Sequence, residues 1–147
     1  MQTSLNQLLS YEHPAVINRF QREFPQNAHQ AEIIFKDLLR FFWATEKHEM
    51  DRHQNPLHEG FDFLFIMDEE MKAMKAIDQM WHVFLLYTQD YADFCSKYFN
   101  QYIHHLPDIV PNLSQDEEEF EKNLNRFLNY CYDTLGEETV RRWFSEN

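Results

Sequence analysis

Apolar residues recur every three or four positions along most of the chain, which is the spacing of one face of an α-helix. The clearest case is residues 88–103, where aromatic side chains follow this period. Residues 28–50 carry a wider apolar surface, so we expect a central helix that contacts several neighbours. Further helical segments are predicted at residues 4–9, 15–24, 71–87, 113–135 and 137–144.

Prolines and capping residues indicate where these helices begin and end. Pro14 and Pro25 flank the predicted helix of residues 15–24. Gly136 is expected to end the predicted helix of residues 113–135. Residues 51–61 contain a proline and a glycine and are predicted to form a loop. The next run, FDFLFIM, fits either a short extended segment or the start of a helix. The N-terminal caps that we expect are Thr3 or Ser4, Asn27, Thr88 and Ser114.

The amino-acid composition also favours a helical fold. Valine occurs four times and glycine twice, whereas sheets favour β-branched residues and tight turns favour glycine. The apolar share of 44% and the aromatic share of 16% are too high for a disordered chain. We therefore expect residues 1–147 to form a single all-α domain, a compact bundle of about six helices.

The net charge of −12 favours some classes of binding partner over others. It repels nucleic-acid phosphates and anionic membrane surfaces, and it suits a basic protein partner. The chain has no apolar run of transmembrane length and no basic residues before its first apolar stretch. Its two cysteines, Cys95 and Cys131, form no CxxC motif and are expected to be free core residues. These features indicate a cytoplasmic protein and leave export by a non-classical route open.

Asp78 and His82 are the first candidates for chemistry. They lie four residues apart in a predicted helix, so their side chains share one face. A carboxylate and an imidazole can both bind a metal ion. Alternatively, Asp78 accepts a hydrogen bond from His82 and satisfies it in a partly buried position. The spacing alone leaves both interpretations open.

His104 and His105 are the second candidates, at the end of the following predicted helix. Two helices joined by a short turn at Thr88 are expected to pack antiparallel, which returns residues 104 and 105 towards Asp78. If that helix continues through residue 105, His105 extends its core-facing stripe; if it ends earlier, either histidine can reach Asp78. We therefore predict a site for a divalent metal, zinc or iron, formed by Asp78, His82, His104 and His105.

Other candidates fit known chemistry less well. His48, His53 and His58 recur every five residues, which matches no helical face. A nucleophilic pair of Cys95 and His104 lacks a basic cluster or helix N-terminus that would lower the pKa of the thiol. No GxSxG, P-loop or GxGxxG motif is present in the sequence.

Residues 77–107, IDQMWHVFLLYTQDYADFCSKYFNQYIHHLP, resemble the core motif of the glycine-rich domain-containing protein-like family. That motif combines D-x-x-W-H, a T-x-x-Y segment, a cysteine and HH-x-P. Similarity to the family also includes AEIIFKDLLRFFW upstream and FLNYCYDTLGEETVRRW downstream, so it covers about residues 28–143. The matching positions are Asp78, Trp81, His82, Leu86, Thr88, Tyr91, Cys95, Phe99, His104, His105 and Pro107.

The chain departs from the family pattern at two positions. Phe84 stands where members often have a second histidine, and Asn100 stands where they often have glycine. If that second histidine is a ligand in relatives, the site of this chain is a reduced one. The 147 residues contain no glycine-rich stretch like the tail of the plant members. The resemblance implies a shared motif without implying a reaction.

Three functions remain compatible with the sequence. The first is a non-catalytic binding module that holds a divalent metal and a protein partner. The alternative is an inhibitor or immunity-type module whose acidic surface blocks a basic partner protein. The third is a metal-dependent hydrolase in which a metal-bound water is the nucleophile.

Overall fold

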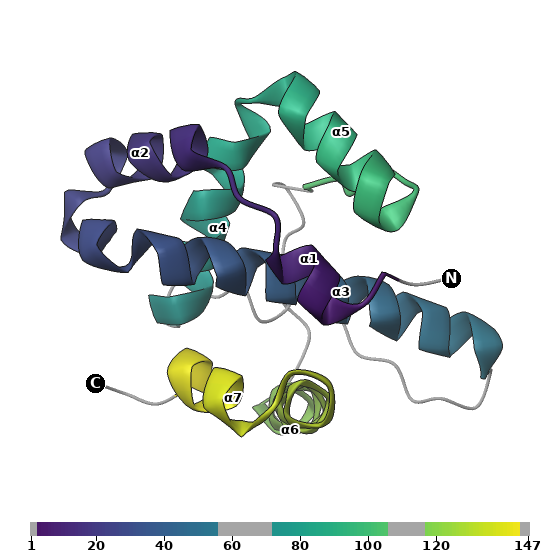
Figure 1. Ribbon diagram of the computed structural model, residues 1–147. Coiled ribbons are helices and arrows are strands. Elements are labelled where there is room, and N and C mark those ends of the chain that lie inside the picture. Colours follow the sequence, from purple (N-terminus) through teal and green to yellow (C-terminus); the bar gives the residue numbers. More distant parts are fainter. Residues whose placement is uncertain (1–2, 56–71, 106–116, 145–147) are drawn as a thin grey trace.

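The computed structural model describes residues 3–55, 72–105 and 117–144. These residues form seven α-helices, one 3-10 helix and no strand, which confirms the all-α prediction (Figure 1). The helices are α1 (Leu5–Leu9), α2 (Pro14–Glu23), α3 (Ala31–Gln54), α4 (Lys72–Leu85), α5 (Thr88–Phe99), α6 (Glu117–Leu135) and α7 (Glu137–Phe144), with the 3-10 helix η1 (Pro25–Gln30) before α3.

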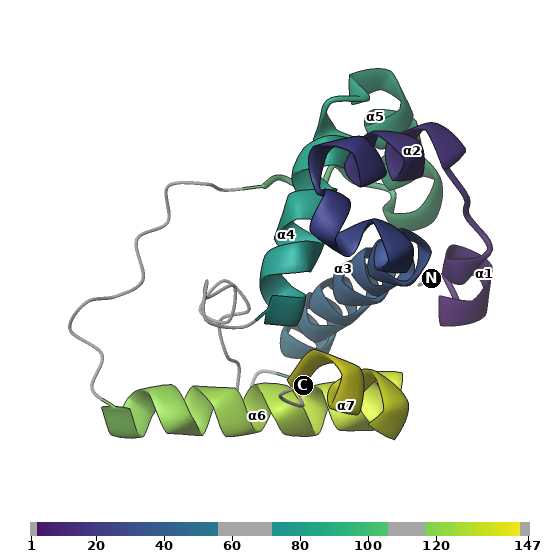
Figure 2. The same ribbon diagram turned by 90° about the vertical axis from the view of Figure 1, so that its left-hand side faces the viewer.

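Helix α3 is the centre of the structure, as its wide apolar surface predicts. It contacts α1, α2, η1, α4 and α6. Helices α6 and α7 lie across one end of the α3–α4 pair, and α2 and α5 lie at the other end (Figure 2). No helix in the described part of the chain is both long and apolar enough to cross a membrane.

Local signals set several helix ends. Ser4 accepts a hydrogen bond from the backbone of Gln7, whose side chain bonds back to Ser4, so the predicted cap at Ser4 is confirmed as a capping box. His13 caps α2, since its Nδ1 accepts from the Val16 N–H. Gly136 has φ 96° and separates α6 from α7, in agreement with its predicted role.

Several predicted boundaries are wrong; for example, α4 ends at Leu85 and not at Tyr87. Asn27 lies inside η1, and α3 begins only at Ala31. The same helix continues to Gln54, so residues 51–54 are helical although we expected a loop; no proline or glycine interrupts the helix before Pro56. The N-cap of α5 is Tyr87, which makes no side-chain capping bond, and Thr88 is already helical. The expected cap at Ser114 and the FDFLFIM run lie outside the described residues.

The core between the helices is largely aromatic. Trp81 of α4 packs against Phe42 of α3 with ring centroids 5.0 Å apart and an edge-to-face angle of 80°. Phe84, one turn further, contacts Tyr91 and Phe94 of α5 in the same way. Such pairs add to the stabilisation that apolar burial supplies.

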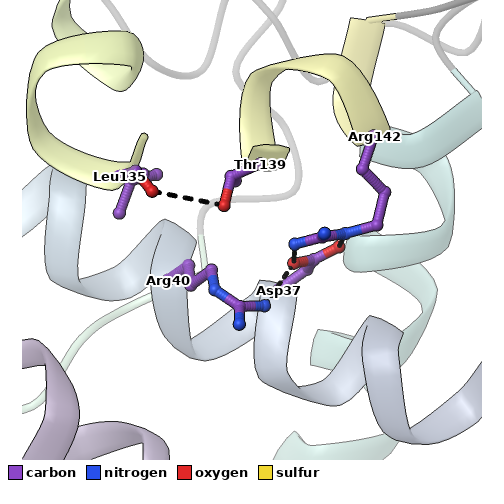
Figure 3. Close-up of polar contacts among 5 residues, drawn as sticks. All are labelled: Asp37, Arg40, Leu135, Thr139 and Arg142. Atoms are coloured by element: carbon purple, nitrogen blue, oxygen red, sulfur yellow. Dashed lines mark hydrogen bonds and ion pairs between the residues drawn. The ribbon is translucent and has the colours of Figure 1, made fainter. Parts of the chain in front are cut away.

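An ion-pair cluster around a buried carboxylate attaches α7 to α3 (Figure 3). Arg142 donates from Nε to one oxygen of the Asp37 carboxylate at 2.8 Å and from an Nη to the other at 2.6 Å. Arg40 donates to the same carboxylate at 2.7 Å. The Asp37 side chain is only 6% exposed, and a buried carboxylate is tolerated only when it is paired in this way.

Candidate functional site

Asp78, His82 and His105 converge on one point of the surface. One ligand atom from each residue lies within 4.8 Å of the other two. Asp78 and His82 are one turn apart on α4, whereas His105 follows α5. The side chains differ in exposure, at 33% for Asp78, 53% for His82 and 12% for His105. His105 therefore lies on the inner side of the cluster, and His82 lies on the side that faces solvent.

The two oxygens of the Asp78 carboxylate face different imidazoles. Oδ1 is 2.7 Å from Nε2 of His105, which is a hydrogen bond. Oδ2 is 3.7 Å from Nε2 of His82, which is too long for one. The rings of His82 and His105 have centroids 4.5 Å apart and an interplanar angle of 59°. Asp78 and His105 are therefore hydrogen-bonded to each other, whereas His82 lies near the same carboxylate without forming a hydrogen bond to it.

The end of α5 determines how His105 reaches this point. The helix stops at Phe99 because Asn100 adopts the left-handed conformation, with φ 55° and ψ 24°. The expectation that the helix runs to residue 103 is therefore wrong. Residues 102–105 belong to no helix, and Ile103 is buried. His105 then packs edge-on against Trp81, with ring centroids 4.4 Å apart at 76°.

His104, the fourth predicted ligand, lies elsewhere. It is exposed, and its ring contacts Tyr102 with a centroid distance of 4.6 Å. The one group of three or more potential ligands that the described residues form contains His105 and not His104. Because residues 102–105 are not helical, no helical periodicity could distinguish the two histidines in advance.

The histidines that recur every five residues, His48, His53 and His58, contribute to no group of potential metal ligands within the described residues. His48 is buried in α3, with its ring edge-on to Tyr130 at a centroid distance of 5.2 Å. His53 is exposed near the end of the same helix, and His58 lies outside the described residues. The position of His48 indicates a core histidine.

Cys95 does not have the environment of a nucleophile. Its side chain is buried in α5, and this burial raises the pKa of the thiol. A raised pKa disfavours the reactive thiolate. Burial also raises the pKa of Cys131, and both cysteines are free, as expected from their sequence context.

Phe84 and Asn100, the two positions at which residues 77–107 depart from the motif that they resemble, have clear structural roles. Phe84 is fully buried and faces Tyr91 and Phe94, so a histidine at this position would point away from Asp78 and His82. The lack of that histidine removes no ligand from the cluster. Asn100 occupies the left-handed conformation that glycine adopts without strain and that asparagine tolerates better than most residues.

The cluster offers two nitrogen donors and one carboxylate. Zinc binds such atoms at about 2.0–2.2 Å, which places neighbouring tetrahedral ligands about 3.4 Å apart. The observed spread of 4.8 Å exceeds this value. His82 lies at the exposed rim, so a change of its rotamer is the simplest way to close the triad around an ion.

Comparison with known proteins identifies a family without naming an activity. No curated protein and no solved structure matches the chain. Residues 54–141 match the UCP032817-like family. The matched span contains α4, α5 and the whole Asp78–His82–His105 cluster, and it covers more than half of the 147 residues. The chain belongs to the UCP032817-like family.

Proposed function

We propose that this protein is a small non-catalytic binding module in which Asp78, His82 and His105 hold one divalent metal ion. The observation that carries the proposal is the position of His82. A structural clasp needs only the 2.7 Å bond between Asp78 and His105. It leaves unexplained why a half-exposed imidazole also stands 3.7 Å from the same carboxylate.

The donor set supports zinc or iron over calcium or magnesium. Imidazole nitrogen suits zinc and iron, whereas magnesium and calcium prefer oxygen ligands only. Asp78 and His82 would hold the ion from α4, and His105 would hold it from the segment after α5. Bound there, the ion would supply a cross-link between the two segments, and an open ligand position would remain for water or for a group from a protein partner.

The glycine-rich domain-containing protein-like resemblance fits this proposal. Asp78, His82 and His105 all belong to the motif that carries the resemblance. We therefore propose that relatives with the D-x-x-W-H and HH-x-P elements hold a metal with the same three positions, and that the first histidine of the HH pair is not a ligand.

Removing His82 is the sharpest test, because this side chain is exposed and its loss breaks no hydrogen bond to Asp78. Zinc titrated into the untagged wild-type protein should bind at one ion per chain and raise the midpoint of thermal unfolding. At a free zinc concentration of 100 times Kd, the added stability is about 2.7 kcal/mol. His82→Ala should bind at least tenfold more weakly.

His104→Ala is the matched control, since it removes a neighbouring exposed histidine that lies outside the cluster. It should bind zinc as the wild type does. Iron(II), titrated without oxygen, provides the second metal. Absence of uptake of either ion by the wild-type protein, or equal uptake by His82→Ala, would show that the cluster is a structural clasp.

A further inference from the structure

The hydroxyl group of Tyr91 connects the two segments that form the candidate centre. The indole N–H of Trp81 donates to Tyr91 Oη at 3.0 Å. The Tyr91 hydroxyl donates in turn to the backbone oxygen of Ile103 at 2.6 Å. Trp81 immediately precedes His82, and Ile103 lies two residues before His105. One buried hydroxyl thus joins α4 to the segment that carries His105.

The direction of these bonds is determined by the groups involved. An indole N–H can only donate, and a backbone oxygen can only accept. The hydroxyl is the one group between them that does both. Trp81, Tyr91 and Ile103 are all buried, so water cannot replace the hydroxyl as their partner. A phenylalanine at position 91 would leave the indole N–H and the backbone oxygen without this partner.

The segment after α5 depends on such bonds because it has no regular backbone pairing. Residues 102–105 lie outside any helix. Besides the bond from Tyr91 to Ile103, the Gln101 amide donates to the Glu46 carboxylate, but that pair is exposed. The ring of Trp81 also contacts His105 directly, with centroids 4.4 Å apart. The Trp81 indole therefore acts on this segment in two ways. It binds the Tyr91 hydroxyl that holds the Ile103 backbone, and its ring packs directly against the His105 imidazole.

We infer that Tyr91 is a positioning residue of the candidate centre, whose hydroxyl aligns His105 with Asp78 and His82. The part of this inference that concerns metal affinity rests on the proposed function. The part that concerns the bond between His105 and Asp78 does not, because that bond exists without an ion. The two parts can be tested separately.

The first measurement uses metal-free protein with isotope-labelled histidine. In Tyr91→Phe, the NMR signals of the His105 imidazole should move towards those seen in Asp78→Ala, where the partner of His105 is absent. Incorporation of 4-fluorophenylalanine at position 91 keeps the size of the side chain but removes the hydroxyl proton that the Ile103 oxygen accepts, and it should cause a shift in the same direction. This second variant keeps the inference testable if Tyr91→Phe does not fold. Unchanged His105 signals in the folded variants would overturn the inference.

The second measurement is zinc affinity. Residues that orient metal ligands typically change metal affinity by about 10–100-fold when they are replaced, so we expect Tyr91→Phe to weaken zinc binding within that range. Tyr102→Phe is the matched control, because its half-exposed ring contacts Tyr91 with a centroid distance of 5.3 Å. It should leave zinc affinity unchanged.

General loss of stability needs its own control. Phe127→Leu alters a buried residue of α6, far along the chain from the centre, and should lower the unfolding midpoint without changing zinc affinity. Equal zinc affinity of Tyr91→Phe and the wild type would refute the positioning role. If the wild type binds no zinc while Tyr91→Phe still shifts the His105 signals, the proposed function fails and the positioning of His105 by Tyr91 stands.

Discussion

Asp37 is a carboxylate on the apolar face of the central helix. Its neighbours along that face, Ile34, Leu38 and Phe41, are all buried core residues. Asp37 is stable there because Arg142 binds both of its oxygens and Arg40 binds one of them. Two fixed guanidinium groups replace the water that a charged group loses on burial.

Replacing Asp37 with asparagine should destabilise the fold. The amide keeps the shape of the side chain but leaves two arginines facing each other without a negative charge. Because Arg40 and Arg142 stay partly exposed, we expect a loss of about 2–4 kcal/mol in the free energy of unfolding, at or below the usual cost of breaking a buried pair. Urea denaturation followed by circular dichroism measures this loss.

Asp133→Asn is the control for Asp37→Asn, since it makes the same change at an exposed aspartate of the neighbouring helix α6. It should change the free energy of unfolding by less than about 0.5 kcal/mol. A similarly small effect of Asp37→Asn would mean that the ion pair does not attach α7 to α3.

At the scale of elements, the end of α5 is the feature that forms the candidate centre. The aromatic stripe of residues 88–103 continues the helical period past the point where the helix actually ends. Asn100 in the left-handed conformation interrupts it and redirects the chain. Ile103 then enters the core, and His105 reaches Asp78.

Substitutions at Asn100 should separate backbone conformation from side-chain chemistry. Asn100→Gly should change the free energy of unfolding by less than about 0.5 kcal/mol, because glycine adopts positive φ without a steric penalty. Asn100→Val should cost about 1–2 kcal/mol, because a β-branched residue is strained at φ 55°. Urea denaturation of both variants measures these changes.

Gly136→Ala is the comparison at the other positive-φ position. A Cβ atom at Gly136 would meet nothing within 4 Å, so the expected loss of about 1 kcal/mol reports backbone strain alone. Zinc affinity should fall in Asn100→Val and stay unchanged in Gly136→Ala. Equal stability of the glycine and valine variants at position 100 would contradict the left-handed turn.

At the scale of the whole molecule, the burial of tyrosines makes the free energy of unfolding depend on pH in the alkaline range. Burial raises the pKa of Tyr11 to about 12 and also raises the pKa values of Tyr91 and Tyr130. In the unfolded chain a tyrosine loses its proton near pH 10. The folded state therefore binds more protons than the unfolded state above that pH, so stability is fully present below pH 10 and is lost as the pH rises.

We expect the protein to unfold cooperatively between about pH 10 and pH 12. The phenolate absorbance of Tyr11, Tyr91 and Tyr130 should appear together with the loss of the helical circular dichroism signal. Tyr11→Phe should move the transition to higher pH, since it removes one of the groups that ionise on unfolding. Complete phenolate formation in a chain that keeps its helical signal would disprove the coupling.

Relations between residues a few positions apart specify the helical class of the chain and place Asp78 and His82 of the candidate centre on one face. Few glycines and valines, with apolar residues at helical spacing, specify an all-α chain. Ser4 and Gly136 act as caps because capping depends on neighbours a few residues away. Asp78 and His82 share a face because residues four apart on one helix always do. All of these are local relations within a single segment.

Which segments meet depends on the packing of the helices and cannot be inferred from spacing along the chain. His105 rather than His104 joins Asp78, Tyr91 spans α4 and the segment after α5, and Arg142 pairs with Asp37. These contacts link residues whose separation in the sequence carries no period. Their partners depend on a left-handed turn after α5 and on how whole helices pack. Periodicity shows which side chains share one face, whereas packing selects what that face contacts.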